Sequence, residues 1–201
     1  MGAVRGNAVD PNEAVRAGLI TAARRCFHRF GVRRTTMEDV AAEAGFARAT
    51  LYKLVPGRAE VIEAVIMQRL TELAEGWREI LVAQRSVAEA LGETSLAIVE
   101  TVRNDPELRA LFETTTGTRL IRLLAGPEPA VRGYVVEFYA ELFARGRARG
   151  ELRDDVTDEQ MADWIRGIIL MLILREDLTR HEERVMIESF LLPSLGAQPR
   201  T

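Results

Sequence analysis

The chain has 201 residues, of which 47% are hydrophobic, so it can bury a sizeable core without disulfide staples. Its single cysteine, Cys26, excludes an internal disulfide framework, and its longest apolar run, 168–174, is too short to cross a bilayer. We therefore expect a soluble protein of the reduced cytoplasm, built as one generous domain or two small ones.

Charge is distributed unevenly along the chain. Residues 1–60 hold ten basic and six acidic residues, a net charge of +4, whereas the remainder holds 17 basic and 24 acidic residues, a net charge of -7. A basic first third is typical of a domain that binds a polyanion, and an acidic remainder keeps the rest of the protein soluble. On charge alone, chance asymmetry explains the pattern equally well.

Apolar residues recur at helical spacing through the whole chain, and no alternating strand pattern occurs. Helices are predicted over residues 12–30, 37–44, 48–55, 60–81, 86–103, 106–125, 129–149, 157–175 and 180–192. The fold class is therefore all-α, with an N-terminal domain at 1–60 and a helical body at 61–201. Within the first domain, residues 1–11 are expected to form a disordered arm, from which Arg5 could reach a minor groove.

Two short predicted helices follow the first long one and are separated by a tight turn. Thr36 is a good N-cap for the first of them, and Asp39 three residues on completes a capping box. Gly45 supplies the backbone freedom for the turn, and Phe46 pins that turn to the core. Two helices of this size joined by a glycine turn form a helix-turn-helix, whose second helix enters the major groove of DNA.

The second helix begins at Ala47 or Arg48 and is stopped by Pro56. Its inward residues are Leu51, Leu54 and Val55, and its outward residues are Arg48, Ala49, Tyr52 and Lys53, with Thr50 at the edge. An arginine can fork onto a guanine edge, an alanine can touch a thymine methyl group, and tyrosine, threonine and lysine can donate to phosphates. This outward face therefore favours contact with DNA.

The wider pattern resembles the tetracycline-repressor (TetR) family of bacterial transcriptional regulators. The resemblance rests on AARRCFHRFG, RTTMEDVAAEAG, ARATLYKLVPGR and AEVIEAV, which occur in that order over about residues 14–65. It implies a ligand-responsive, sequence-specific DNA-binding regulator, most often a repressor. It also implies these DNA contacts: Thr36, Tyr52, Lys53 and Arg58 at phosphates, and Arg48, Ala49 and Thr50 at the base-contacting start of the second helix. Two features depart from the family pattern, namely Ala47 in place of a capping serine and Leu54-Val55 in place of an aromatic pair.

The body is expected to dimerise and to bind an effector. Because family members pair their last two major helices across a twofold axis, we expect a homodimer on a pseudo-palindromic operator. The expected interface residues are Ile165, Ile169, Leu172, Ile187, Phe190 and Leu191. The expected lining of a small-molecule pocket is Trp77, Phe112, Tyr134, Phe138 and Trp164, although aromatic residues at helical spacing are more often plain core. Effector binding is expected to shift the helix predicted at 60–81.

Two other classes of protein are alternatives to a DNA-binding regulator. An enzyme is disfavoured because His28, His181 and Cys26 lack partners at catalytic or metal-binding spacing, and no phosphate-binding glycine loop occurs. No cofactor, metal or membrane partner is expected. A helical adaptor that uses the same motif face for a protein partner is the remaining alternative. DNA affinity falls steeply with ionic strength, so the salt dependence of binding separates the two readings.

Overall fold

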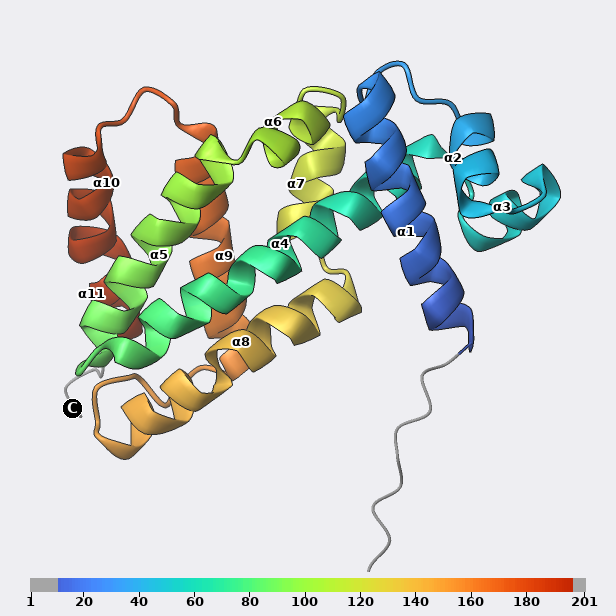
Figure 1. Ribbon diagram of the computed structural model, residues 1–201. Helices are drawn as coiled ribbons and strands as arrows, with labels where there is room; N and C mark the ends of the chain where they lie inside the picture. The colour runs from blue at the N-terminus through green and yellow to red at the C-terminus, as the bar shows by residue number, and fades with distance from the viewer. Residues whose placement is uncertain (1–10, 197–201) are drawn as a thin grey trace, which may run out of the picture. The chain divides into compact units, whose positions relative to one another are not determined.

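The computed structural model describes residues 11–196, with side chains from Ala14 onward, and all regular elements in this range are helices (Figure 1). The all-α prediction is thus confirmed. The expected arm and its Arg5 lie outside the described residues, except for residue 11. Of the helices described, none is long and apolar enough to cross a membrane.

The chain divides into two compact units between Arg69 and Leu70. This division falls inside one helix, α4 (Arg58–Ala83), so the first turns of α4 belong to the first unit and the rest to the second. A functional boundary at residue 60 stays a prediction.

The first unit holds three helices and the start of α4. Its elements are α1 (Pro11–Phe30), α2 (Met37–Ala44) and α3 (Arg48–Leu54). α2 packs against both α1 and α3, as Figure 1 shows. Small side chains allow the close approach: Ala22 and Ala23 of α1 and Ala41 of α2 are all buried. Gly31 ends α1 with a φ of 82°, a left-handed conformation that favours glycine.

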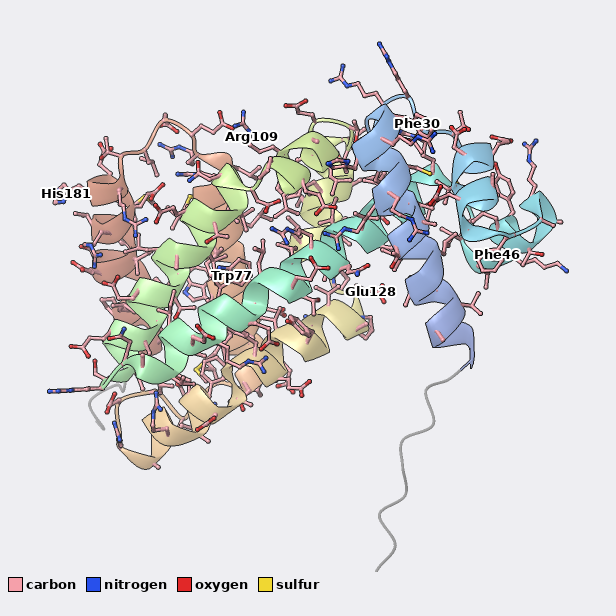
Figure 2. All side chains as sticks on the ribbon, viewed as in Figure 1. Phe30, Phe46, Trp77, Arg109, Glu128 and His181 are labelled. Carbon is pink, nitrogen blue, oxygen red and sulfur yellow. The ribbon has the colours of Figure 1, made fainter. Side chains whose placement is uncertain are left out.

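Local sequence signals build the turn between α2 and α3. The N–H of Asp39 donates to the Thr36 hydroxyl over 3.2 Å, and the N–H of Thr36 donates to the Asp39 carboxylate over 2.8 Å, which confirms the capping box. Gly45 has a φ of 72°, and the N–H of Phe46 donates to the Ala41 carbonyl over 2.9 Å. Phe46 lies in this turn, half-buried (Figure 2). The turn therefore forms as the sequence predicts.

The second unit is a bundle around α5 and α9. Beyond residues 70–83 of α4, its elements are α5 (Val87–Asn104), α6 (Pro106–Phe112), α7 (Gly117–Ala125), α8 (Pro129–Ala148), α9 (Asp158–Leu174), α10 (Arg180–Met186), η1 (Ile187–Leu191) and α11 (Leu192–Leu195). α9 packs against α5, α7 and α8, so it lies inside the bundle rather than at its edge. α10, η1 and α11 lie along α5 (Figure 1).

The helix predicted at 106–125 is two helices, because a run of threonines interrupts it. The hydroxyls of Thr114 and Thr115 donate back to the Leu111 carbonyl over 2.8 and 2.9 Å. Thr116 then caps α7 by accepting the N–H of Arg119 over 3.4 Å. Threonine side chains thus compete for the backbone hydrogen bonds of the helix, so α6 ends and a separate helix, α7, begins.

The last predicted helix, 180–192, contains a π-helical segment and continues to Leu195. The segment η1 inserts a wider turn between α10 and α11, and such turns re-aim the side chains around them. Here Ile187 and Leu191 are fully buried, whereas Phe190 is 67% exposed. Helical spacing alone does not reveal a π turn, so the sequence did not predict it.

One arginine joins three helices of the second unit. Arg103 of α5 donates to the carbonyls of Leu172, Ile173 and Arg175, where α9 ends. Its guanidinium also forms an ion pair with Glu183 of α10, a residue only 3% exposed. We call this arrangement the Arg103 clamp. It satisfies carbonyls that the end of a helix leaves without partners and neutralises a buried carboxylate.

Candidate functional site

α3 presents a continuous polar face to solvent. Leu51 is completely buried beneath the helix and Val55 is 5% exposed, which fixes the orientation of α3 on the first unit. The opposite side of the helix carries the exposed residues Arg48, Ala49, Thr50, Tyr52 and Lys53. The five predicted contacts on α3 thus share one accessible face.

The arginine of this face is held by neighbours on both sides. Arg48 Nη1 lies 2.9 Å from a carboxylate oxygen of Glu38, which belongs to α2. The Arg48 guanidinium carbon also lies 5.6 Å from the centre of the Tyr52 ring, a cation–π contact. Both members of the ion pair are more than half exposed, so the pair is worth little and can open when a stronger anion approaches.

The two remaining predicted contacts have local structural roles. Thr36 is exposed at the start of α2, and its hydroxyl donates to the Asp39 carboxylate over 2.7 Å. Hydrogen bonds from the Thr36 N–H, then from its hydroxyl, lower the pKa of Asp39 below its ordinary value. Arg58 donates to the Val32 carbonyl and, over 3.3 Å, to the Thr35 carbonyl, so it ties the loop between α1 and α2 to the start of α4. No pattern in the sequence indicates this role of Arg58.

The histidines and the cysteine form no reactive cluster. His28 and His181 are exposed, and His181 lies on the outer side of α10 (Figure 2). Cys26 is buried, with Sγ 3.6 Å from the Asp39 carbonyl, and burial raises the pKa of its thiol. No group of side chains in the described residues could hold a metal ion.

The aromatic residues predicted to line an effector pocket differ widely in their exposure. Trp77 and Phe138 are each 8% exposed, and Phe112 and Tyr134 are half-buried. Trp164 is 49% exposed, and its indole N–H donates to the Ser194 hydroxyl over 2.8 Å. Trp164 therefore lies on the outside of the bundle, where it cannot line an internal cavity.

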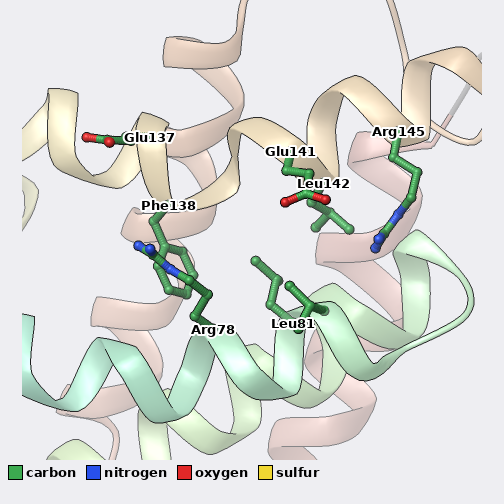
Figure 3. Close-up of a pocket in the computed structure, with 8 residues that line it drawn as sticks. Arg78, Leu81, Glu137, Phe138, Glu141, Leu142 and Arg145 are labelled. Atoms are coloured by element: carbon green, nitrogen blue, oxygen red, sulfur yellow. The ribbon is translucent and has the colours of Figure 1, made fainter. Parts of the chain in front are cut away.

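A small hollow lies between α8 and the second part of α4, and it includes Phe138 (Figure 3). Its volume is about 100 Å³, below the several hundred Å³ of a typical small-molecule site. Its lining residues are Arg78, Leu81, Val82, Glu137, Phe138, Glu141, Leu142 and Arg145. The Arg78 guanidinium lies over the Phe138 ring at 5.6 Å and occupies one side of the hollow. This hollow is too small to hold an effector without movement of its walls.

Five of the six residues predicted for a dimer interface are core residues of the single chain. Ile165, Leu172, Ile187 and Leu191 are fully buried and Ile169 is 7% exposed, whereas Phe190 is accessible. The large exposed apolar residues on these helices are instead Trp164, Leu174, Val185 and Phe190. Because α9 is covered by three helices of its own chain, most of its apolar side chains are buried inside the protomer, and Trp164 and Leu174 are the exposed ones.

Comparison with known proteins agrees with the fold and the motif. Residues 19–65 match the family model described as bacterial regulatory proteins of the tetR family. The chain is 29% identical over 178 residues to Rv1255c, an uncharacterized HTH-type transcriptional regulator of Mycobacterium tuberculosis, and the match covers 87% of this chain and 82% of that protein.

Solved structures share the fold over nearly the whole chain. A TetR-family transcriptional regulator from Pectobacterium atrosepticum superposes with a TM-score of 0.64 at 23% identity, covering 96% of this chain and 100% of that one. Thermus thermophilus FadR, a TetR-family repressor in complex with lauroyl-CoA, gives a TM-score of 0.64 at 21% identity, covering 92% and 97%. The family-model match over residues 19–65 and the helix-turn-helix at residues 37–54 thus identify the N-terminal unit as a DNA-binding domain of the tetR type, and the solved structures show that nearly the whole chain has the fold of TetR-family regulators.

Proposed function

We propose that the protein is a cytoplasmic, ligand-responsive repressor that binds a pseudo-palindromic operator as a homodimer. The observation that carries the DNA-binding part is the exposed face of α3 above the buried Leu51. Arg48, Ala49 and Thr50 contact base edges from the start of α3, and Tyr52 and Lys53 contact phosphates. Thr36 adds a phosphate contact at the start of α2. Arg58 supports the DNA-binding surface indirectly, because it holds the loop that precedes α2.

The homodimer is supported by geometry and by exposed apolar side chains. A recognition helix of seven residues contacts few base pairs, whereas two copies placed about 34 to 36 Å apart contact two half-sites. Trp164, Leu174, Val185 and Phe190 are 42 to 67% exposed, although large apolar side chains favour burial. We place these four residues in the interface, in place of the five buried ones.

Response to a ligand is supported by the body of the fold. FadR from Thermus thermophilus, which shares this fold, binds lauroyl-CoA. We propose that an organic ligand binds in the second unit of this chain and changes its affinity for DNA. A coupling of about 1 to 3 kcal/mol would change that affinity about 5-fold to 150-fold.

Selection of bound sites from random double-stranded DNA by the purified protein tests this function. We expect an enriched inverted repeat with half-sites about one helical turn apart, and sedimentation of the free protein as a dimer. Affinity for the selected site should fall with salt, with a log-log slope near -0.9 for each phosphate contacted. A lack of sequence enrichment together with weak salt dependence would instead favour the adaptor.

A further inference from the structure

A cluster of charged side chains joins α8 and α9 near the end of α7. Its members are Arg132 of α8, Asp163 and Arg166 of α9, and the carbonyl of Gly126 after α7. We call it the Arg166 cluster. Exposure falls along the cluster, from 41% for the Arg132 side chain to 30% for Asp163 and 10% for Arg166. The cluster therefore runs from the surface to the interior of the second unit.

The guanidinium of Arg166 is only partly satisfied. Its Nη2 donates to the Gly126 carbonyl and to an Asp163 oxygen, each over 2.9 Å, which uses both hydrogens of that nitrogen. Its Nε and Nη1 are buried and have no hydrogen-bond partner. Three of the five N–H groups of a nine-tenths-buried cation therefore lack an acceptor, which is costly unless something else supplies one.

Arg166, the deepest cation of the cluster, has no carboxylate to itself. The carboxylate of Asp163 is shared, because Arg132 donates to both of its oxygens while Arg166 donates to one of them. Glu159 also interacts electrostatically with Arg132, whereas Arg166 has only the carboxylate that it shares with Arg132. Burial lowers the pKa of Arg166, with a smaller contribution from Arg132, as expected for a cation with too little negative charge around it.

Apart from Asp163, which lies three residues before it, the neighbours of Arg166 on its side of α9 are apolar. The residues four before, three after and four after it on the helix are Ala162, Ile169 and Leu170, and each is buried. The backbone at Gly126 is fixed as well, because a Cβ atom there would lie 2.0 Å from the Arg122 carbonyl oxygen. The Gly126 carbonyl is thus held facing Arg166 by a turn that only glycine allows.

We propose that the Arg166 cluster binds the carboxylate of an organic monocarboxylic acid with an apolar tail, and that this acid is the effector of the protein. The carboxylate oxygens of such an acid can accept the free N–H groups of Arg166, and an apolar tail is compatible with the apolar side chains beside Arg166 on α9. This inference rests on the proposed ligand response, and it adds the chemical class of the ligand and the residue that selects it.

Calorimetric titration of the full-length protein tests the inference. The probes are straight-chain monocarboxylates from acetate to decanoate together with benzoate, each compared with its neutral primary amide. We expect at least one acid to bind, and its amide to bind at least about tenfold more weakly, because hydrogen bonds to a charged partner are lost. Equal binding of acid and amide, or no binding by any acid, would overturn the proposal.

Two variants assign the binding to this cluster. R166M should weaken binding of the acid at least about tenfold, whereas R109M, which removes an exposed arginine of α6, should bind it like the parent. Unchanged binding by R166M would overturn the assignment, and the comparison of acid with amide on the parent protein decides the proposal even if R166M does not fold. Binding of the selected operator is measured in parallel. An operator-binding protein that ignores every acid refutes the inference while leaving the DNA-binding function intact.

Discussion

Replacing Arg103 by methionine removes the cation of the Arg103 clamp and leaves the Glu183 carboxylate buried without a counter-charge. Deleting one partner of a buried ion pair costs about 3 to 5 kcal/mol. The Arg103 side chain is 21% exposed and that of Glu183 is 4% exposed, so some water can reach the gap, and we expect the lower end, about 3 kcal/mol. For a protein of this size, that loss lowers the melting temperature by about 6 to 12 °C.

Urea unfolding followed by tryptophan fluorescence measures this loss in the relevant unit, because Trp77 and Trp164 are the only tryptophans of the chain and both lie in the second unit. The double variant R103M/E183Q should recover at least about 1 kcal/mol relative to R103M, since a neutral amide is cheaper to bury than a charge. The matched control R109M should stay within about 0.5 kcal/mol of the parent. A loss below about 1 kcal/mol in R103M, or no recovery in the double variant, would refute the reasoning.

Three further predictions concern the DNA-binding face, the dimer and the α2 cap. Tyr52→Ala should weaken binding to all DNA sequences, whereas Arg48→Ala should relax preference at one base position by about 1 to 3 kcal/mol, as measured by binding to single-base variants of the selected site. Phe190→Asp should convert the dimer into a monomer on sedimentation, since it places a charge in the proposed interface, and an unchanged dimer would remove Phe190 from it. Folding lowers the pKa of Asp39, so the ionised carboxylate stabilises the folded protein. This stabilisation is complete above the unfolded pKa of about 3.9 and is lost as pH falls through the folded pKa. Asp39→Asn should accordingly be less stable than the parent at pH 7, and the difference should shrink toward pH 3 in urea titrations.

The features predicted correctly from sequence depend on residues close together in the chain. The capping box joins Thr36 to Asp39, and the turn needs only Gly45 and its neighbours. The outward face of α3 follows from helical spacing around Leu51. In each case a few consecutive residues contain both partners of the interaction, so the pattern is sufficient.

The predicted dimer interface shows where helical spacing stops being informative. Most of the apolar side chains of α9 are covered by α5, α7 and α8, which belong to the same chain. Ile165 and Leu172 are buried whichever helix covers them, so hydrophobicity does not tell an intrachain contact from an interface. The exposed position of Phe190 depends on the π turn at η1, which leaves no mark in the apolar periodicity.

Arginine shows the same limit in its sharpest form, because one residue type serves opposite purposes in this protein. Arg48 is accessible and held only by a surface carboxylate, so it can exchange that partner for DNA. Arg58 and Arg103 instead donate to backbone carbonyls 23 and up to 72 residues away, which makes them structural. The Arg166 side chain is less exposed than that of Arg103 but keeps N–H groups without acceptors. A guanidinium becomes structural when folding satisfies its donors and stays available for binding when it does not, and only the folded chain determines which of these occurs.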